Sequence, residues 1–190
     1  MIPAPFEYLA PRSTEEAVEA LSRHGEDAKL LAGGQSLLPM MKLRIVQPRF
    51  LIDLGRIPNL DAVHAEGEEL VLGAMTAHHM LETSALVLER VPVLAEAASE
   101  IGDLQVRNRG TVGGSIAHAD PAADLPAVML ALDAQFHAVG PAGERVISAR
   151  DFFVDTYTTA LQPAEILTHI RINGLPRRAG GGGRREPSSG

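Results

Sequence analysis

Apolar residues near the start of the chain recur at the spacing of an amphipathic helix. Ser13 and Glu16 have the spacing of a capping box, in which a hydroxyl and a carboxylate satisfy backbone N–H groups at a helix start. Ala17 and Leu21 then fall on one helical face, and Gly25 marks the stop. The pattern predicts a helix of about three turns that begins after Ser13.

Two short, mostly apolar runs follow this helix. Residues 28–32 and 50–54 have the length and composition of buried strands. Gly33 and Gly34 end the first run in a tight turn, and residues 37–43 fit a short helical turn. Together with the preceding helix, these elements predict a small β-α-β unit.

The rest of the chain alternates short helices with short strands. A hairpin is expected over residues 62–65 and 69–72, and Thr76 is expected to cap a helix that runs through Leu81. The polar, glycine-rich segment 105–117 is interpreted as an extended stretch that leads into a loop. Further helices and strands are expected, in chain order, over residues 93–101, 126–132, 135–139, 144–147 and 166–172. This mixture predicts the α+β class rather than a repeating βαβ series.

Composition narrows the possible functions. Acidic residues outnumber basic ones 24 to 17, a formal net charge of −7, which argues against nucleic acid as a partner. Cysteine is absent, so this chain offers no disulfide, no thiolate zinc site and no ligand for an iron–sulfur cluster. No apolar run approaches the ~20 residues of a transmembrane segment, and the N-terminal residues lack a secretory signal pattern. We therefore expect a cytoplasmic protein.

Two glycine-rich segments are the strongest candidates for a binding site. The first centres on Gly33-Gly34, and the second contains Thr111, Gly113, Gly114 and Ser115. Glycine lets a backbone approach a phosphate closely and lets successive N–H groups point into one concavity. No P-loop lysine motif and no G-x-G-x-x-G fingerprint is present. Each segment alone favours a tight turn, whereas the two segments together leave nucleotide binding and simple turns about equally favoured.

Charged residues beside the second segment could contact a ligand or could have only a structural role. Asp120 and Asp124 follow it, where a carboxylate could accept hydrogen bonds from ribose or ribityl hydroxyls. Asp124 could instead cap the helix expected after it. Arg107 and Arg109 precede the segment and could meet a phosphate or an acidic partner, or could lie in a solvated loop.

The seven histidines give no metal motif in the sequence. His78 and His79 are adjacent and point in different directions on a helix, and the others stand apart along the chain. No H-E-x-x-H pattern or carboxylate cluster accompanies them. Ser36 and Ser115 lack a neighbouring general base. We therefore expect neither a metal site nor catalytic residues.

Three blocks of sequence carry a resemblance to a known family. These are residues 30–44, 111–115 and 117–126, and residues 105–110 lie between them in the expected order. They resemble the FAD-binding medium subunit of molybdenum hydroxylases, such as aerobic-type carbon monoxide dehydrogenases and xanthine dehydrogenase-like enzymes. The similarity runs from about Ile2 to Leu175.

The resemblance implies a two-lobed FAD-binding fold, of the type shared with vanillyl-alcohol-oxidase-like flavoproteins. A small β-α-β lobe over residues 1–55 would face a larger lobe with an antiparallel sheet and helices over residues 56–176. Residues 177–190 would form a disordered tail rich in glycine and arginine.

The same resemblance implies the residues that contact FAD. Asp124 matches the family's acidic contact, Leu167 lies where the backbone meets the flavin surroundings, and Ile101 lies where some relatives place an aromatic residue. The complete set implied is Leu30, Leu31, Ala32, Gly33, Gly34, Gln35, Ser36, Leu37, Ile101, Thr111, Val112, Gly113, Gly114, Ser115, Asp124 and Leu167.

The function implied is electron transfer. A molybdenum-cofactor large subunit would oxidise the substrate, a 2Fe-2S small subunit would relay electrons, and FAD would pass them to a quinone or NAD. Relatives continue into a C-terminal domain with a further FAD-contacting lysine, which this sequence lacks. Two alternatives stay open: a truncated, non-catalytic binding or scaffold chain that transfers no electrons, and a stand-alone FAD oxidase.

Overall fold

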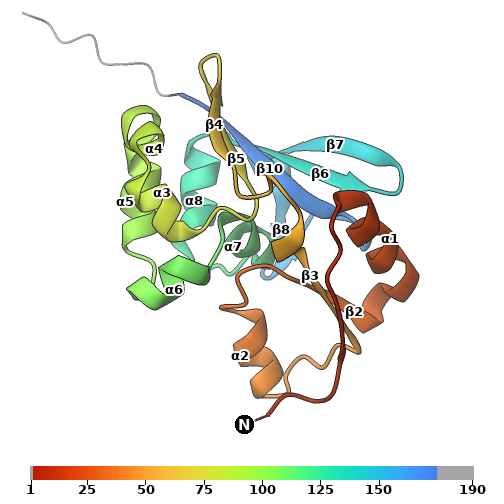
Figure 1. The fold of residues 1–190 in the computed structure, drawn as a ribbon. Coiled ribbons are helices and arrows are strands. Elements are labelled where there is room, and N and C mark those ends of the chain that lie inside the picture. The colour runs from red at the N-terminus through yellow and green to blue at the C-terminus, as the bar shows by residue number, and fades with distance from the viewer. Residues whose placement is uncertain (1, 175–190) are drawn as a thin grey trace, which may run out of the picture.

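The computed structural model describes residues 2–174 (Figure 1). This part of the chain contains two main sheets and the helices that pack against them. The smaller sheet is parallel and has the strand order β1-β3-β2. Its strands are β1 (Glu7–Leu9), β2 (Ala28–Leu31) and β3 (Phe50–Asp53). Helix α1 (Thr14–His24) precedes β2, and α2 (Leu37–Lys42) lies between β2 and β3. The predicted β-α-β unit is thus confirmed, and β1 is an additional edge strand.

Helix α1 forms where the capping pattern predicts it. The Ser13 hydroxyl accepts a hydrogen bond from the Glu16 N–H, whereas the Glu16 carboxylate accepts one from the N–H of Arg12. The side chain of Glu16 therefore reaches one residue beyond the cap. Ala17 and Leu21 are buried, and Gly25 ends the helix with φ +52°, a conformation that favours glycine.

The larger sheet is antiparallel and has the order β4-β5-β10-β6-β7. Its strands are β4 (Val63–Glu66), β5 (Glu69–Gly73), β6 (Gln135–Gly140), β7 (Gly143–Ser148) and β10 (Ile166–Asn173). The last strand of the sheet in the sequence is the central one, so the predicted hairpin β4-β5 and the pair β6-β7 become one sheet only when β10 enters between them. A short ribbon of β8 (Phe153–Asp155) and β9 (Thr158–Thr159) precedes it.

Seven short helices accompany the larger sheet, most of them between β5 and β6. They are α3 (His78–Thr83), α4 (Ala85–Arg90), α5 (Pro92–Ser99), α6 (Leu104–Arg109), α7 (Val112–His118), α8 (Asp124–Ala131) and α9 (Ala149–Phe152). Their apolar residues and the inner face of the sheet form the main core, in which Phe136, Phe152 and Met129 are fully buried. Burial of such side chains contributes roughly 1.5–3 kcal/mol each.

A second core joins the two sheets. It contains Ala17 and Leu21 from α1, Ile52 from β3 and Ile166 from β10 of the larger sheet. The lobe built on the small sheet is therefore completed by a residue from the other lobe. The division at residue 55 stays a prediction, and the predicted tail at 177–190 lies outside the described residues.

Two local predictions are wrong. Residues 104–109 and 112–118 are helical, so the second glycine-rich segment begins a helix rather than following an extended stretch. Thr76 does not cap α3, because its hydroxyl donates to the Asp61 carbonyl and the N-cap residue is Ala77. The prediction of a polar loop failed because tertiary contacts override the low helix propensity of two adjacent glycines.

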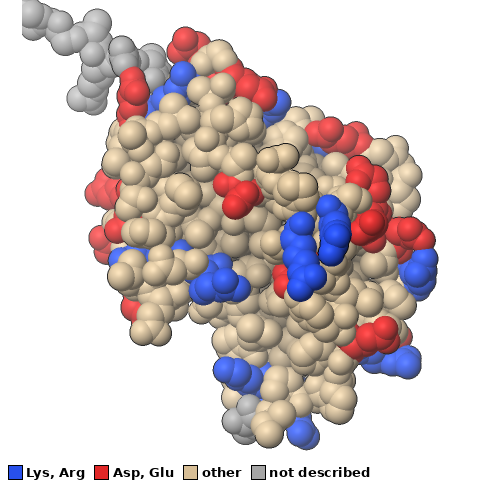
Figure 2. Space-filling model, in the orientation of Figure 1, with Lys and Arg blue, Asp and Glu red and all other residues tan. Residues whose placement is uncertain are grey.

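Charged side chains on one face of the molecule are dispersed. Figure 2 shows acidic and basic side chains in small groups among uncharged ones, without a continuous basic surface on that face. No helix of residues 2–174 is long and apolar enough to cross a membrane.

Candidate functional site

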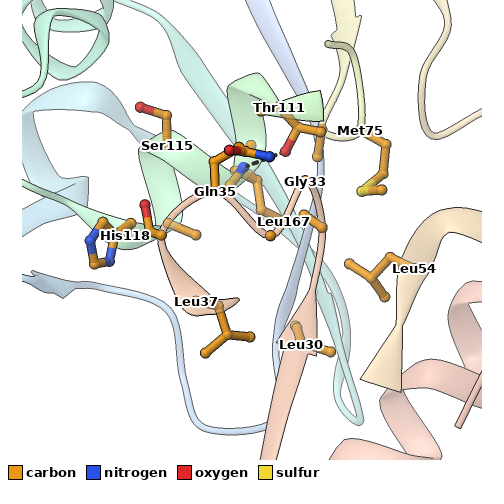
Figure 3. Close-up of a pocket in the computed structure, with 18 of the residues that line it drawn as sticks. Leu30, Gly33, Gln35, Leu37, Leu54, Met75, Thr111, Ser115, His118 and Leu167 are labelled. Carbon is orange, nitrogen blue, oxygen red and sulfur yellow. Dashed lines mark hydrogen bonds between the residues drawn. The ribbon is translucent and has the colours of Figure 1, made fainter. Parts of the chain in front are cut away.

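A cavity of about 670 Å³ lies where the two lobes meet (Figure 3). One wall is the turn after β2, from Ala32 to Leu37, and the facing wall is the N-terminal part of α7 with Thr111. The strand β10 contributes Leu167, and α2 closes one side with Met40. Sequence segments that are separated by about eighty residues thus line a single cavity.

Glycine is required where the two walls touch. A β-carbon on Gly33 would lie 2.1 Å from the carbonyl oxygen of Arg109, so any side chain there would push the walls apart. Gly34 has φ +75°, a backbone conformation that side-chain-bearing residues rarely adopt. The first segment therefore combines a close backbone approach with a turn that only glycine makes without strain.

The two glycines of the second segment differ, because Gly113 meets the interior of its own lobe whereas Gly114 lines the cavity. A β-carbon on Gly113 would lie 2.5 Å from the β-carbon of Ala74, and one on Gly114 would lie 2.8 Å from the Thr111 hydroxyl oxygen. The Gly113 contact lets α7 dock directly against the turn after β5, so packing explains this glycine. At Gly114 the capping hydroxyl of Thr111 leaves little room for a side chain.

The two segments differ in their backbone N–H groups. In the described part of the chain, the N–H groups of Gly33, Gly34, Gln35 and Ser36 donate to no protein acceptor. The N–H groups of α7 are already used, because Val112 donates to the Thr76 carbonyl, Gly113 to the Ala74 carbonyl and Gly114 to the Thr111 hydroxyl. Only the first segment offers consecutive free donors to a bound group, as phosphate binding by a backbone concavity requires.

Two aspartates follow α7, and only Asp120 lines the cavity. Asp120 is a lining residue, and one of its carboxylate oxygens accepts a hydrogen bond from the N–H of Ala122. Asp124 is exposed and lies in the first turn of α8, beside the lining residue Ala123. Because the N-cap residue is Ala123, Asp124 is not the cap, so its carboxylate is left available for a ligand.

The arginines before the second segment have separate roles. The Arg107 guanidinium lies 3.0 Å from the Glu82 carboxylate and also donates to the carbonyls of Ile101 and Gly102, which fixes α6 in place. Arg109 lines an adjoining polar cavity of about 500 Å³ that shares the Gly33 wall.

A buried, neutral histidine is among the residues that line the cavity. His78 is 4% exposed, and burial lowers the pKa of its imidazole to about 4. Its backbone N–H donates to the Gly110 carbonyl, while its Nδ1 is buried with no partner in the described part of the chain. Two further lining residues, His118 and Tyr157, have ring centroids 5.1 Å apart.

Most residues that the sequence singled out come together here. The cavity lining includes Leu30, Ala32, Gly33, Gly34, Gln35, Ser36, Leu37, Ile101, Thr111, Gly113, Gly114, Ser115 and Leu167. Leu31, Val112 and Asp124 are not among the lining residues. Val112 is fully buried in the main core, so a contact from it to a ligand would have to come through its backbone.

Sequence reasoning missed several lining residues. Four lining residues come from four different parts of the chain: His78, Met40, Met75 and Tyr157. Nothing in their local sequence separates them from ordinary core or surface residues. Only the packing of the lobes places them on one cavity.

Fold and site together define a class of protein. A two-lobed α+β domain with a cavity between the lobes, lined by a glycine turn with free N–H donors and by apolar side chains, is built to bind a large, phosphate-containing cofactor. FAD, with its diphosphate and its extended apolar ring system, fits both features of this cavity.

Comparison with known proteins identifies the family. Residues 4–173 match the family described as FAD binding domain in molybdopterin dehydrogenase, and the chain belongs to that family. Its cofactor is FAD. The family resemblance and the two-lobed fold expected from the sequence are confirmed.

Relatives with known names extend the match. The chain is 52% identical to the carbon monoxide dehydrogenase medium chain of Hydrogenophaga pseudoflava over 180 residues, which cover 95% of this chain and 63% of that one. It is 41% identical to the alpha subunit of the 6-hydroxypseudooxynicotine dehydrogenase complex of Paenarthrobacter nicotinovorans, covering 95% and 61%. The chain therefore spans about three fifths of these curated relatives.

Solved structures agree. A carbon monoxide dehydrogenase from Hydrogenophaga pseudoflava superposes with a TM-score of 0.92 over 93% of this chain and 62% of that one, at 52% identity. UDP-N-acetylenolpyruvylglucosamine reductase from Thermus caldophilus, at 16% identity, gives a TM-score of 0.58 over 88% of this chain and 55% of that one. The second likeness shows a shared fold alone.

Proposed function

We propose that this chain is the FAD-binding, electron-transferring part of a molybdenum hydroxylase. The observation that carries the proposal is the first glycine segment, where free N–H groups adjoin a cavity large enough for a dinucleotide. Membership of the family supports FAD as the occupant, and relatives named as dehydrogenase medium chains support an oxidoreductase role.

Within this proposal, the residues around the cavity divide the work of binding. The N–H groups of Gly33 through Ser36 hold the diphosphate, because they are the consecutive donors left unpaired. The free carboxylate of Asp124 accepts hydrogen bonds from hydroxyl groups of the cofactor. Ile101 and Leu167 provide apolar walls. Leu31 and Val112 complete the two segments through their backbone.

The protein's contribution to the chemistry is positional. FAD supplies the redox chemistry when it is bound, while the cavity sets its position and surroundings. The aliphatic side chains of Ile101 and Leu167 limit the access of water from two sides. His78, neutral at physiological pH, adds no positive charge to the cavity wall.

The proposal extends to partners. Electrons would come from a 2Fe-2S small subunit beside a molybdenum-cofactor large subunit, and a quinone or NAD would accept them. The absence of cysteine supports this division, since a cluster would need ligands from another chain. A cytoplasmic location belongs to the same proposal.

A flavin titration tests the proposal. The purified chain is mixed with increasing FAD, the excess is removed, and the absorption spectrum of the retained flavin is recorded. Stoichiometric flavin that photoreduction bleaches and a quinone or NAD reoxidises supports the electron-transfer role. A folded chain that retains no flavin would favour the scaffold alternative. Co-purification with cluster-bearing subunits separates the proposed role from that of a stand-alone oxidase.

A further inference from the structure

Three potential metal ligands meet on the outer face of the larger sheet. His137 on β6 and His169 on β10 are direct cross-strand partners, and Glu144 on β7 pairs with Val139, two residues beyond His137. Side chains two residues apart on a strand share a face, so Glu144 lies diagonally beside His137. One donor atom from each of the three residues lies within 4.8 Å of the other two.

The side chains are already in contact. The His137 and His169 rings stack with centroids 4.0 Å apart, and His137 Nδ1 lies 2.8 Å from Glu144 Oε1. His137 is 9% exposed, His169 is half-buried and Glu144 is exposed. The cluster is therefore rooted in the sheet and open on the side of Glu144, where an ion and its water ligands could enter.

Hydrogen bonding orients His169 for coordination. The Thr168 hydroxyl donates to the His137 carbonyl at 3.1 Å, so its oxygen accepts a hydrogen bond from His169 Nδ1 at 3.2 Å. This arrangement places the proton of a neutral His169 on Nδ1 and leaves the lone pair of Nε2 free. A second partner that fixes the tautomer in this way is a regular feature of metal-binding histidines.

The surrounding charge permits a cation. Arg171 is the nearest cation on the same face of β10, and its guanidinium lies 2.7 Å from the Glu66 carboxylate and 3.0 Å from that of Glu69. Those two carboxylates more than balance its charge. A divalent ion beside Glu144 would therefore not face an uncompensated positive charge on this strand.

We propose that His137, Glu144 and His169 bind a divalent transition-metal ion of the Zn²⁺ type. Two imidazoles and one carboxylate are a preferred ligand set for such ions, with water completing the coordination. Tetrahedral zinc would bring the three donors to roughly 3.3 Å from one another, which needs rotation of the exposed Glu144 side chain and of the half-buried His169 side chain. The bound ion would link β6, β7 and β10, independently of FAD.

Metal titration of the whole chain, free of any histidine tag, tests the site. We expect saturable binding of one Zn²⁺ by calorimetry, a rise in melting temperature, and a visible Co²⁺ spectrum. His169→Phe keeps a ring in the stack but removes a ligand, and should abolish saturable binding. Glu144→Gln changes an exposed side chain and should weaken binding at least about tenfold.

A matched control uses another histidine of the same sheet. His64 on β4 lies 3.1 Å from Glu66, so it forms a similar exposed pair without a third ligand. His64→Gln should bind Zn²⁺ as the unchanged chain does. Equal binding by Glu144→Gln and His64→Gln, or no saturable binding by the unchanged chain, would show that the cluster is only a hydrogen-bonded pair and would overturn the proposal. Circular dichroism checks that each variant is folded.

Discussion

The two glycine-rich segments look alike in the sequence and do different work in the structure. In the first, Gly33 lets two backbones touch and leaves consecutive N–H groups free at the cavity. In the second, Gly113 lets α7 pack against Ala74, and its N–H groups are consumed by the protein itself. A glycine pair beside a hydroxyl residue therefore does not by itself identify a donor site for phosphate. A segment can donate to a phosphate only if its N–H groups do not already donate to acceptors within the protein.

Substitution of Gly33 should give the largest effect on cofactor binding. Gly33→Val would place side-chain atoms against the Arg109 carbonyl and separate the two walls, so we expect FAD affinity to fall at least about 100-fold and stability by about 1–3 kcal/mol. Fluorescence titration with FAD and denaturant unfolding measure the two effects.

The matched control for this variant is Gly67→Asn. Gly67 has φ +59°, and a β-carbon there would meet nothing within 4 Å, so asparagine fits a similar turn without contacting the site. FAD affinity of the control should be unchanged. If Gly33→Val bound FAD as tightly as Gly67→Asn, the role given to the first segment would be wrong.

Acid should lower the stability of the folded chain through His78, which lies beside the second segment. His78 packs against Gly110, and its pKa is lowered to about 4 in the folded chain from an ordinary value of 6.5. Between these values the unfolded chain binds more protons than the folded one. Stability should therefore fall by roughly 3 kcal/mol as pH falls from about 6.5 to 4.

Unfolding free energies across that pH range measure this dependence, and His78→Gln supplies the comparison. The variant should lose most of the pH dependence that comes from this group. An identical acid profile in His78→Gln would assign the acid sensitivity to other residues.

Gly113→Ala should separate stability from binding. Its β-carbon would press on Ala74, so we expect a loss of about 1–3 kcal/mol in the free energy of unfolding. Because the N–H groups of α7 already donate to protein acceptors, we expect FAD affinity measured well below the melting temperature to fall less than about tenfold, equivalent to less than 1.4 kcal/mol. A loss of affinity as large as that of Gly33→Val would remove the distinction between the segments.

Removal of the hydroxyl groups of Thr111 and Ser36 should have the smallest effects on stability. The Thr111 hydroxyl caps α7, so Thr111→Ala should lower stability by about 1 kcal/mol and Thr111→Ser should restore most of it. The Ser36 side chain makes no capping hydrogen bond to α2, so Ser36→Ala should leave stability unchanged. Thermal unfolding of the three variants checks this, and equal losses at both positions would contradict it.

Local sequence patterns were sufficient where local physics decides the structure. The capping spacing of Ser13 and Glu16 placed α1, and the apolar runs placed β2 and β3 to within a residue. The position of β10 between β5 and β6 depends on pairing between distant residues and left no local signal. The helices over residues 104–118 depend on contacts such as that between Gly113 and Ala74, so composition suggested a loop.

The candidate site was predictable in part for the same reason. Contiguous segments such as residues 30–37 carry a pattern that can be read from the chain, and by resemblance they pointed to FAD. His78 and Tyr157 reach the same cavity through packing alone. His137, Glu144 and His169 are dispersed in sequence, and strand pairing alone makes them neighbours.

Amide hydrogen exchange with and without FAD distinguishes the two glycine-rich segments by their N–H groups. NMR or mass spectrometry would follow the N–H groups of Gly33 through Ser36 and, as an internal comparison, those of Val112 through Gly114. We expect fast exchange in the first group that slows at least about tenfold when FAD is added, and slow exchange in the second group throughout. Protection of the second group alone, or no change in the first while FAD is bound, would contradict this expectation.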